Sequence, residues 1–391
     1  MLPKHIHKRL EEWKNKNRMR LRSIVQYRDH SHIVVKNKML VNFTSSDYLC
    51  LATHPDVKKS FAKGAMTYGL GSTSAPLISG YSKAHYLLEE TFAEFLGRDK
   101  ALLFNSGYHA NIGVITALCD RHSLIIADKH CHASLLDGMQ LSRAHYIRFK
   151  HNNDKHAESL LKKTKQSSHP FIVTESVFSM RGDITIAQSL VKLAKKYQAT
   201  LLIDDAHGIG ILGREGKGII EIAQLSQADL PCLITPLGKA IGSMGALVSG
   251  PADLIDTLVQ FARTYRYSTA LPAAICQATL CAIKLVKKES WRRESLIQLI
   301  RYFNDGAKAR NIKLISFDET PIKCIITNDS NITLKIQNEL IDYGFYVSCI
   351  RPPTASKSLI RISITISHTA TQIERLLDWL YLRMSTPHAQ P

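Results

Sequence analysis

Short apolar runs alternate with helical patterns from about residue 100 onward, and this alternation constrains the fold more than any other feature. The apolar runs end in polar or small residues and lie at 101–104, 124–127, 171–174 and 201–203. Helically periodic stretches lie between them, at 111–118, 155–165 and 187–197. Strands that alternate with helices predict βαβ units and a mostly parallel, buried sheet. Ligands bind beyond the carboxyl ends of such strands, so the residues after each run are the first candidates for a site.

The N-terminal and C-terminal parts of the chain do not show this alternation of strands and helices. A helical stretch follows residue 272 and continues to about residue 303. Short strands at 322–326, 346–349 and 360–364 and helices at 334–343 and 371–384 then predict a smaller α+β domain. The basic stretch from Lys4 to Arg28 predicts an amphipathic helix with Ile6, Leu10, Trp13 and Leu21 on or near its apolar side. We therefore expect three parts: an N-terminal helix and arm at 1–45, a large domain at 46–285 and a small C-terminal domain at 286–391.

Charge and cysteine content narrow the class of protein. The formal charge is +18, which suits nucleic acid, an anionic membrane or an acidic partner. The basic residues are spread along the whole chain, however, which favours a well-solvated surface over a nucleic-acid or membrane site. The eight cysteines form no Cys-x-x-Cys pair and no metal-binding spacing, so we expect free thiols in a reducing compartment and no metal. The N-terminus lacks the apolar stretch of a secretion signal, and no run approaches ~18 apolar residues. The expectation is a cytoplasmic protein.

A carboxylate and a histidine follow the apolar run at 201–203. Asp204 lies directly at the predicted strand end, and His207 follows three residues later. An acid at this place suits pyridoxal phosphate, because it keeps the ring nitrogen protonated and lets the ring withdraw electrons. The same carboxylate is also able to cap the next helix. The glycines at 208–213 match a dinucleotide fingerprint by spacing, but they neither follow the strand directly nor open a helix, so we expect no dinucleotide site.

Lys239 lies between small residues after the apolar run at 232–234, in the segment Thr-Pro-Leu-Gly-Lys-Ala-Ile-Gly. A lysine that binds a carbonyl cofactor covalently must be partly desolvated, so that its neutral amine is available. Nearby glycines let a bulky cofactor approach the backbone. Taken alone, the motif fits a surface-loop lysine at least as well.

Two further strand ends carry small, polar or imidazole groups. Residues 104–111 read Phe-Asn-Ser-Gly-Tyr-His-Ala-Asn, a strand end followed by a helix start whose N–H groups would hold a phosphate. Residues 128–134 include His130 and His132. A flat imidazole after a strand is able to stack on a flat cofactor, although an ordinary turn and a structural histidine are the commoner interpretations of each motif. We expect His130 to be structural.

Together, the order of these four motifs resembles that of the α-oxoamine synthase family of pyridoxal-phosphate enzymes. The resemblance covers nearly the whole chain and includes segments 42–49, 69–80, 174–180 and 350–354. It implies an α/β fold of the aspartate-aminotransferase type (fold-type I), with a mostly parallel sheet in the large domain and a smaller α+β C-terminal domain. It also implies an acyltransferase that joins an amino acid to an acyl thioester with loss of CO2. Segment 267–272 and the Arg-Pro-Pro-Thr segment are most like the branch that uses L-alanine and a pimeloyl thioester.

The resemblance also implies the roles of the residues around the ring. Lys239 would carry pyridoxal phosphate and move the α-proton. Asp204 would pair with the pyridine nitrogen, and His207 would bond the ring hydroxyl oxygen. His132 would stack on the ring next to the substrate, and Ser179 would lie beside the ring.

Further residues would hold the phosphate and the substrates. Gly107 and Tyr108 would bind the phosphate through backbone N–H groups. Ser268 and Thr269 would reach the phosphate of the other subunit in a homodimer. Arg361 would bind the amino-acid carboxylate, and two more residues would lie near the substrates, namely Arg20 and Thr354.

Five positions depart from the family pattern. Ser46 stands where asparagine is usual, Cys50 where glycine is usual and Arg181 where aspartate is usual. Leu359 replaces the first arginine of an Arg-x-Arg pair. Pro236 replaces a threonine whose hydroxyl usually bonds the phosphate, and proline has neither a hydroxyl nor an N–H.

Three alternatives follow for function and partners. The chain resembles an enzyme for alanine and pimeloyl thioester, but another α-oxoamine synthase, such as a glycine C-acetyltransferase or a long-chain aminoketone synthase, shares its motifs. A non-enzymatic basic binding protein is the alternative from a different class. The charge of +18 exceeds the ~2–8 typical of a small soluble domain. The excess suits an acidic acyl-carrier protein, and coenzyme A also carries phosphates.

Overall fold

The computed structural model describes residues 2–16, 18–163, 169–327 and 329–385. The chain divides into two compact units. The larger unit comprises residues 46–179 and 184–294, and the smaller comprises the described residues of 1–45, 180–183 and 295–391. Within the described ranges, no helix is both long and apolar enough to cross a lipid bilayer.

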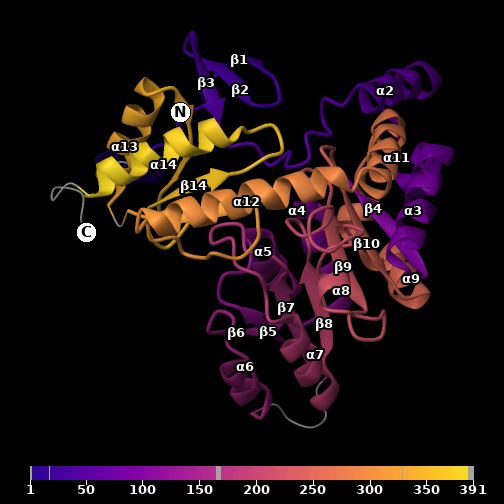
Figure 1. Cartoon of the computed structure of the whole chain (residues 1–391). Coiled ribbons are helices and arrows are strands. Elements are labelled where there is room, and N and C mark those ends of the chain that lie inside the picture. The colour runs from indigo at the N-terminus through magenta and orange to yellow at the C-terminus, as the bar shows by residue number, and fades with distance from the viewer. Residues whose placement is uncertain (1, 17, 164–168, 328, 386–391) are drawn as a thin grey trace. The chain divides into compact units, whose positions relative to one another are not determined.

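A seven-stranded sheet forms the centre of the larger unit (Figure 1). Strands β5, β6, β7, β8 and β9 pair in parallel, which confirms the expected mostly parallel sheet. Strand β10 was not expected, and it pairs antiparallel with both β4 and β9. Strand β4 therefore runs in the same direction as β9. The spatial order is β4 (Lys100–Phe104), β10 (Ala246–Gly250), β9 (Cys232–Pro236), β8 (Thr200–Asp204), β7 (Phe171–Glu175), β5 (Leu124–Asp128) and β6 (His145–Phe149).

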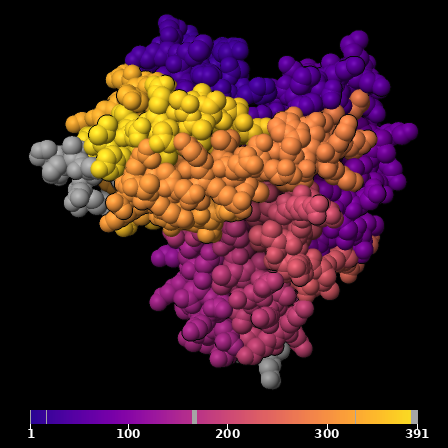
Figure 2. All heavy atoms as spheres, in the orientation of Figure 1, coloured from indigo at the N-terminus to yellow at the C-terminus, as the bar shows by residue number. Residues whose placement is uncertain are grey.

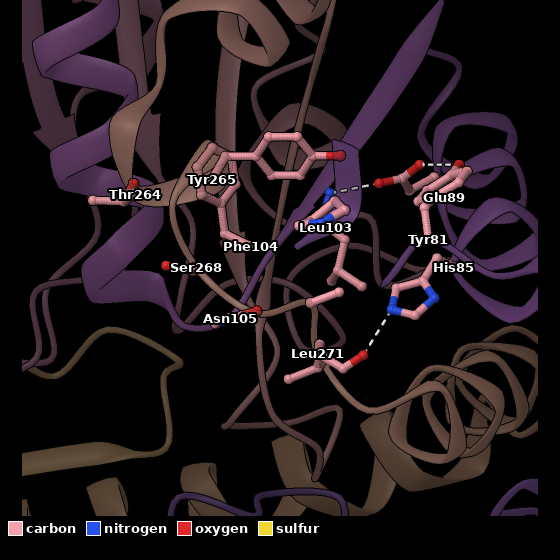
Figure 3. A pocket seen from close by; sticks show the side chains of 12 residues that line it. Tyr81, His85, Glu89, Leu103, Phe104, Asn105, Thr264, Tyr265, Ser268 and Leu271 are labelled. Atoms are coloured by element: carbon pink, nitrogen blue, oxygen red, sulfur yellow. Dashed lines mark hydrogen bonds between the residues drawn. The ribbon is translucent and has the colours of Figure 1, made fainter. Parts of the chain in front are cut away.

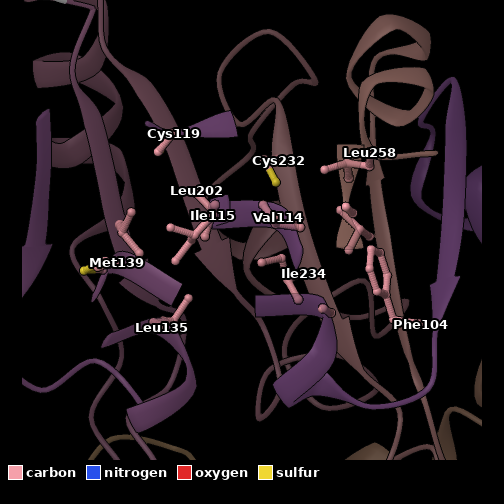
Figure 4. Close-up of a cluster of buried hydrophobic side chains, with 14 of the residues drawn as sticks. Phe104, Val114, Ile115, Cys119, Leu135, Met139, Leu202, Cys232, Ile234 and Leu258 are labelled. Carbon is pink, nitrogen blue, oxygen red and sulfur yellow. The ribbon is translucent and has the colours of Figure 1, made fainter. Parts of the chain in front are cut away.

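Apolar side chains on one face of this sheet pack against helices α4 (Gly107–Leu118), α5 (Ala133–Ser142) and α9 (Ala252–Phe261). Figure 4 shows this core, where Leu202 and Ile234 of the strands lie among Val114 and Ile115 of α4. Each such side chain contributes roughly 1.5–3 kcal/mol when fully buried. This packing holds the start of α4 rigidly beside the ends of the strands.

Other helices complete the larger unit. Helices α2 (Pro55–Tyr68), α3 (Lys83–Leu96) and α11 (Ala273–Lys288) lie side by side at one end of it (Figures 1 and 2). The shorter elements are η1 (Pro76–Gly80), α6 (Asp154–Leu161), α7 (Ala187–Lys196), α8 (Ile219–Ile222) and α10 (Arg263–Arg266). The helix expected at 155–165 thus ends at Leu161, and residues 164 and 165 lie outside the described residues.

The single helical stretch expected from residue 272 to about 303 is instead two helices. Helix α11 ends at Lys288, and α12 (Trp291–Ala309) begins three residues later. The buried Arg293 guanidinium donates to the carbonyl of Val286 (2.6 Å). A carbonyl in the last turn of a helix has no partner within the helix, so this bond stabilises the end of α11.

The smaller unit contains two sheets and three helices besides the rest of α12. One sheet has the order β1 (Val25–Arg28), β2 (His32–Val35), β3 (Lys38–Asn42) and β12 (Phe345–Tyr346). The other has the order β11 (Ile322–Ile326), β14 (Leu359–Ser363) and β13 (Ser348–Ile350). The helices are α1 (Lys4–Asn15), α13 (Ser330–Asp342) and α14 (Ala370–Ser385).

The expectation of one amphipathic helix from Lys4 to Arg28 is wrong beyond Asn15. Helix α1 ends there, and Leu21 lies outside any helix with 89% of its surface exposed. The end of the stretch forms β1, which pairs with β2 so that Val25 faces Val35. The helical pattern of this stretch therefore forms a helix only in α1. Beyond α1, pairing of β1 with β2, which is close by in the chain, determines the structure.

Candidate active site

The carboxyl ends of six strands meet at one edge of the large sheet, because β4, β5, β6, β7, β8 and β9 run in the same direction. Three neighbouring strands, β5, β7 and β8, each end in a residue with a carboxyl side chain. These residues are Asp128, Glu175 and Asp204. Each of these side chains is at most 5% exposed. Apart from Ser268 and Thr269, the predicted site residues of the larger unit lie at or just after strand ends, so the structure gathers them at one edge.

A chain of hydrogen bonds links Asp204 with His132. The Asn111 amide nitrogen donates to Asp204 Oδ2 (2.7 Å) and to Ser134 Oγ (2.8 Å). Ser134 Oγ lies 2.7 Å from Nδ1 of His132, which also accepts the Ser134 N–H (3.3 Å). The second Asp204 oxygen accepts the N–H of Ala206 (3.0 Å). Both oxygens of this carboxylate are therefore held in place.

Two buried carboxyl groups lie side by side, because Glu175 and Asp204 are register partners on β7 and β8. Burial raises the pKa of Glu175 well above its ordinary value, and the neighbouring Asp204 raises it further. Burial also raises the pKa of Asp204, but the Asn111 bond and the nearby side chains of His132 and Lys239 lower it. Two adjacent carboxylates repel each other in a low dielectric, so one proton on Glu175 leaves the negative charge on Asp204.

Glu175 also connects two predicted site residues. Its carboxyl group accepts the backbone N–H groups of His132 and Ser179. His132 caps the start of α5, and Ser179 follows the end of β7 by four residues. This buried acid thus fixes the positions of both loops.

His207 is buried and is oriented by Tyr48. The Tyr48 hydroxyl lies 3.0 Å from Nδ1 of His207, and the tyrosine side chain is completely buried. The bond joins residues that are 159 positions apart. It fixes the orientation of the imidazole through Nδ1.

Lys239 lies in a tight loop between β9 and β10. The N–H of Gly242 donates to the Lys239 carbonyl (2.8 Å), and the N–H of Ser243 donates to the Leu237 carbonyl (3.0 Å). Gly242 has φ +67°, and a Cβ atom there would lie 2.4 Å from the backbone nitrogen of Ala52. Only glycine fits this turn, which presents a half-buried lysine close enough to Asp204 to lower the pKa of that acid.

The first turn of α4 offers backbone donors. Gly107 and Tyr108 open this helix, and the first N–H groups of a helix have no acceptors within it. The Tyr108 hydroxyl donates to Asp137. The Pro236 ring packs directly on Gly107, where an added Cβ would lie 2.7 Å from the ring. An apolar ring thus stands beside this cradle, and the nearby Thr235 hydroxyl is buried.

Ser268 and Thr269 lie beside the same cradle of their own chain. Asn105 donates to the carbonyl of Thr269 (2.7 Å). Ser268 and Asn105 line a cavity of about 10 Å³ shown in Figure 3. At its far side Glu89 accepts bonds from the Tyr81 hydroxyl (2.6 Å) and the Leu103 N–H (2.8 Å), which fixes α3 and the residue after η1 against β4. The Thr269 residue itself is exposed.

Three predicted substrate residues belong to the smaller unit. The Arg20 guanidinium donates to the carbonyls of Arg351 (2.9 Å) and Pro352 (3.1 Å), and the Thr354 N–H donates to the same Arg351 carbonyl (3.1 Å). The structure therefore brings Arg20 and Thr354 together. Arg361 lies in the middle of β14, between Cys324 and Ser348 of the adjacent strands, and is 9% exposed.

The departures from the family pattern have local consequences. Cys50 has φ +53°, a left-handed conformation that glycine adopts at little cost, so the cysteine is strained where glycine is usual. Arg181 forms an ion pair with Asp183 (3.1 Å). Leu359 is buried at the start of β14. Each residue is accommodated within its own unit.

The sequence did not single out four residues that hold the predicted site residues in place, namely Tyr48, Asn111, Ser134 and Glu175. Each of the four lies within a segment that carries the family resemblance, but none of them was itself predicted to be a site residue. Asn111 follows Gly107 by four residues, so a helix starting at Gly107 places both on one face. That spacing was the available signal for Asn111.

The residues at the sheet edge fit a flat, anionic cofactor of the pyridoxal-phosphate kind. A buried carboxylate suits a protonated ring nitrogen, the imidazole of His132 offers a flat surface, and the start of α4 offers N–H groups to a phosphate. A half-buried lysine completes the set. Because proline has no hydroxyl, Pro236 would offer a phosphate one contact fewer than threonine.

Known proteins share this fold and these segments. A family model described as aminotransferase class I and II matches residues 38–380. The 8-amino-7-oxononanoate synthase of Nitrosococcus oceani is 40% identical over 363 residues, which cover 92% of this chain and 96% of that protein. The structure of an 8-amino-7-oxononanoate synthase from Francisella tularensis has a TM-score of 0.77 and 35% identity, covering 88% and 97% of the two chains. A serine palmitoyltransferase from S. paucimobilis with bound PLP (pyridoxal phosphate) and myriocin has a TM-score of 0.91 and 25% identity, covering 97% and 96%.

Proposed function

Because this chain belongs to the aminotransferase class I and II family, we propose that it condenses L-alanine with a pimeloyl thioester to give 8-amino-7-oxononanoate for biotin synthesis. The cofactor of the proposal is pyridoxal phosphate. The observation that carries it is the single sheet edge on which Asp204, His207, His132 and Lys239 converge in a chain 40% identical to an enzyme of that name. Fold alone would leave the chemistry open, since one fold hosts many reactions.

The residues of the chain have distinct parts in this reaction. When bound, pyridoxal phosphate supplies an electron sink that stabilises negative charge on the α-carbon of the amino acid. Asp204 holds the negative charge that pairs with the ring nitrogen, and Asn111 holds Asp204. Lys239 removes the α-proton and later returns a proton. The α-carbon forms a bond to the thioester carbonyl, the thiol leaves, and the amino-acid carboxylate departs as CO2.

The choice of substrates rests on sequence identity more than on backbone likeness. The serine palmitoyltransferase is close in backbone but only 25% identical, whereas the synthase of N. oceani is 40% identical. Side chains select substrates, so the closer sequence is the better guide. Alanine and pimeloyl thioester are therefore preferred to serine and palmitoyl thioester, and to glycine and acetyl thioester.

A product assay tests the proposal. We expect 8-amino-7-oxononanoate from L-alanine with pimeloyl-coenzyme A or pimeloyl-carrier protein, identified by mass. One missing methyl group in a pocket is worth roughly 10- to 200-fold in kcat/KM, so glycine should react at least tenfold more slowly. Acetyl and palmitoyl thioesters serve as controls for the acyl chain. Faster condensation of glycine or serine, or of either control thioester, would assign the chain to another branch of the family.

We also propose that the enzyme works as a homodimer. Large apolar side chains near the cradle are exposed in the single chain, including Leu70 (91%), Ile78 (81%) and Tyr267 (66%). Exposed apolar side chains in this number favour a protein interface. Ser268 and Thr269 lie in the same region and would reach the partner's phosphate.

Sedimentation and rate measurements on dilution test the dimer. We expect twice the mass of the 43.8 kDa chain at micromolar concentration, and a specific activity that falls in parallel with dissociation. Tyr267→Glu, which places a charge in the exposed apolar region, should shift dissociation to higher concentration. A monomer that keeps its full specific activity would contradict the proposal.

An acidic acyl-carrier protein would dock in a groove of the smaller unit. This groove of about 1070 Å³ lies between Lys14, residues 19–26, residues 35–38 and helix α13. Its apolar side chains include Leu21 and Ile341, and the Asp342 carboxylate, which also lines it, is paired with Lys38 (2.8 Å). Its basic residues are Lys14, Arg22, Lys36, Lys38 and Arg351. A cationic rim around apolar side chains complements a small acidic protein that carries an acyl chain.

Salt dependence tests this docking. The kcat/KM for pimeloyl-carrier protein should fall steeply between low and physiological salt, because screening weakens steering by opposite charges. The rate with a small uncharged pimeloyl thioester should change little. Arg22→Glu should lower only the carrier-dependent rate, and Lys192→Glu, on the exposed face of α7, is the matched control. Parallel salt dependences for the two donors would exclude the groove as the docking site.

We place the enzyme in the cytoplasm. All eight cysteines lie within the described residues, and each is a free thiol. Six of them are buried. Free thiols of this number suit a reducing compartment.

A further inference from the structure

We infer that Asn111 is a positioning residue of the active site, whose side-chain amide holds the Asp204 carboxylate and, through Ser134, the imidazole of His132. The inference rests on the proposed function only in requiring the cofactor, since it concerns no acyl substrate. Asn111 is 1% exposed, and its amide nitrogen makes both bonds, to Asp204 (2.7 Å) and Ser134 (2.8 Å). No role in the reaction follows for it from the family motifs.

The orientation of the Asn111 amide is dictated by its neighbours. A carboxylate accepts hydrogen bonds, so it must face the NH2 side of the amide and not the carbonyl oxygen. The two hydrogens of the NH2 group then match the two acceptors, one each. The amide is locked in one orientation, and it locks the carboxylate in turn. A bond to a charged acceptor is stronger than a neutral one, which makes the Asn111–Asp204 bond the main link.

The direction of the bonds also selects the tautomer of His132. Ser134 Oγ accepts from Asn111, so its own hydrogen is available to Nδ1 of His132, 2.7 Å away. The Ser134 N–H points at the same nitrogen (3.3 Å). Nδ1 is therefore the acceptor, and the ring proton resides on Nε2. Asn111 thus presents the flat imidazole in one orientation and with one donor nitrogen.

Asn111 also distinguishes between two adjacent acids. Glu175 and Asp204 lie beside each other at neighbouring strand ends, and only Asp204 receives the Asn111 amide. Glu175 instead accepts the backbone N–H groups of His132 and Ser179. Loss of the amide would weaken the preference for a charge on Asp204, which the ring nitrogen needs. The expected symptom is weaker cofactor binding together with slower turnover.

The test uses Asn111→Ala and Ser134→Ala in the full-length protein, with Thr116→Val as the control. Thr116 lies on the same helix and bonds only carbonyls of its own turns, at Ile112 (2.7 Å) and Gly113 (3.4 Å). We expect Asn111→Ala to lower kcat by about 10- to 100-fold, since a bond to a charged group is lost. It should also weaken cofactor binding in an absorbance titration and shift the absorption maximum, while the KM for alanine changes less than kcat. Ser134→Ala should lower kcat by about 2- to 10-fold, and Thr116→Val should leave all three readouts unchanged.

A double-mutant cycle separates positioning from simple damage to the fold. If Asn111 acts through Asp204, then Asn111→Ala should have little further effect on cofactor binding in the Asp204→Asn background. Ser134→Ala enters the same cycle, so an Asn111 variant that fails to fold does not remove the test. Additive losses in the cycle, or cofactor binding and kcat within twofold of the parent protein, would overturn the inference. The cofactor readouts need no acyl donor, so a wrong acyl substrate would not disturb them.

Discussion

Replacing Lys239 with alanine should abolish turnover and the visible absorption of the covalently held cofactor. In the proposed reaction this side chain supplies both the amine that binds the cofactor and the base that moves the α-proton. Loss of a positioned acid–base group alone costs about 10²- to 10⁴-fold, and loss of the covalent attachment adds to it. The measurement is the spectrum of the purified protein, with and without L-alanine, together with the rate of product formation.

Lys217→Ala provides a matched control for this experiment. Like Lys239, Lys217 is half-buried in a loop of the larger unit, and it lies between Gly216 and Gly218. It forms an ion pair with Glu215 (2.6 Å). Its removal should leave the spectrum and the rate close to those of the parent protein. Full activity in Lys239→Ala, or equal losses in both variants, would refute the central assignment.

Asp204→Asn should fold normally and lose most of its rate, by about 10²- to 10³-fold if electrostatic stabilisation at the ring is lost. The asparagine side chain has nearly the same shape, so it is able to keep the contacts with Ala206 and Asn111 in part. It carries no charge, however, and cannot keep the ring nitrogen protonated. The measurement is kcat with L-alanine, together with the rate of α-proton exchange in deuterated water without an acyl donor.

Asp205→Asn is the control for Asp204→Asn, because Asp205 is as deeply buried but bonds the N–H of Ile219 (3.2 Å) at the start of α8. Its substitution should reduce the rate much less.

Burial raises the pKa of Asp205 to about 7. An acid with a raised folded-state pKa binds a proton that the unfolded chain has lost, so stability falls as pH rises from about 4 to 7. Asp205→Asn should remove that part of the pH dependence. Equal rate losses in Asp204→Asn and Asp205→Asn would mean that the end of β8 has been assigned to the wrong acid.

Several features of the fold were predictable because they depend on neighbours in the chain. The alternation of apolar runs and helices predicted β4, β5, β7, β8 and β9, since strand and helix periods are local properties. Strand β10 was not predicted, because its antiparallel place between β4 and β9 depends on pairing with strands distant in the chain. The same holds for the break between α11 and α12, which the Arg293 bond to Val286 stabilises.

The candidate site divides in the same way. The sequence by itself determined that Asp204, His207, Lys239 and Gly107 follow strand ends, and a parallel sheet brings such ends to one edge. Only the tertiary structure decided what holds them, because those bonds join positions far apart. Asn111 and Asp204 are separated by 93 positions, and Tyr48 and His207 by 159. Periodicity along the chain carries no information about such pairs, because packing of the helices on the sheet determines which buried polar groups meet.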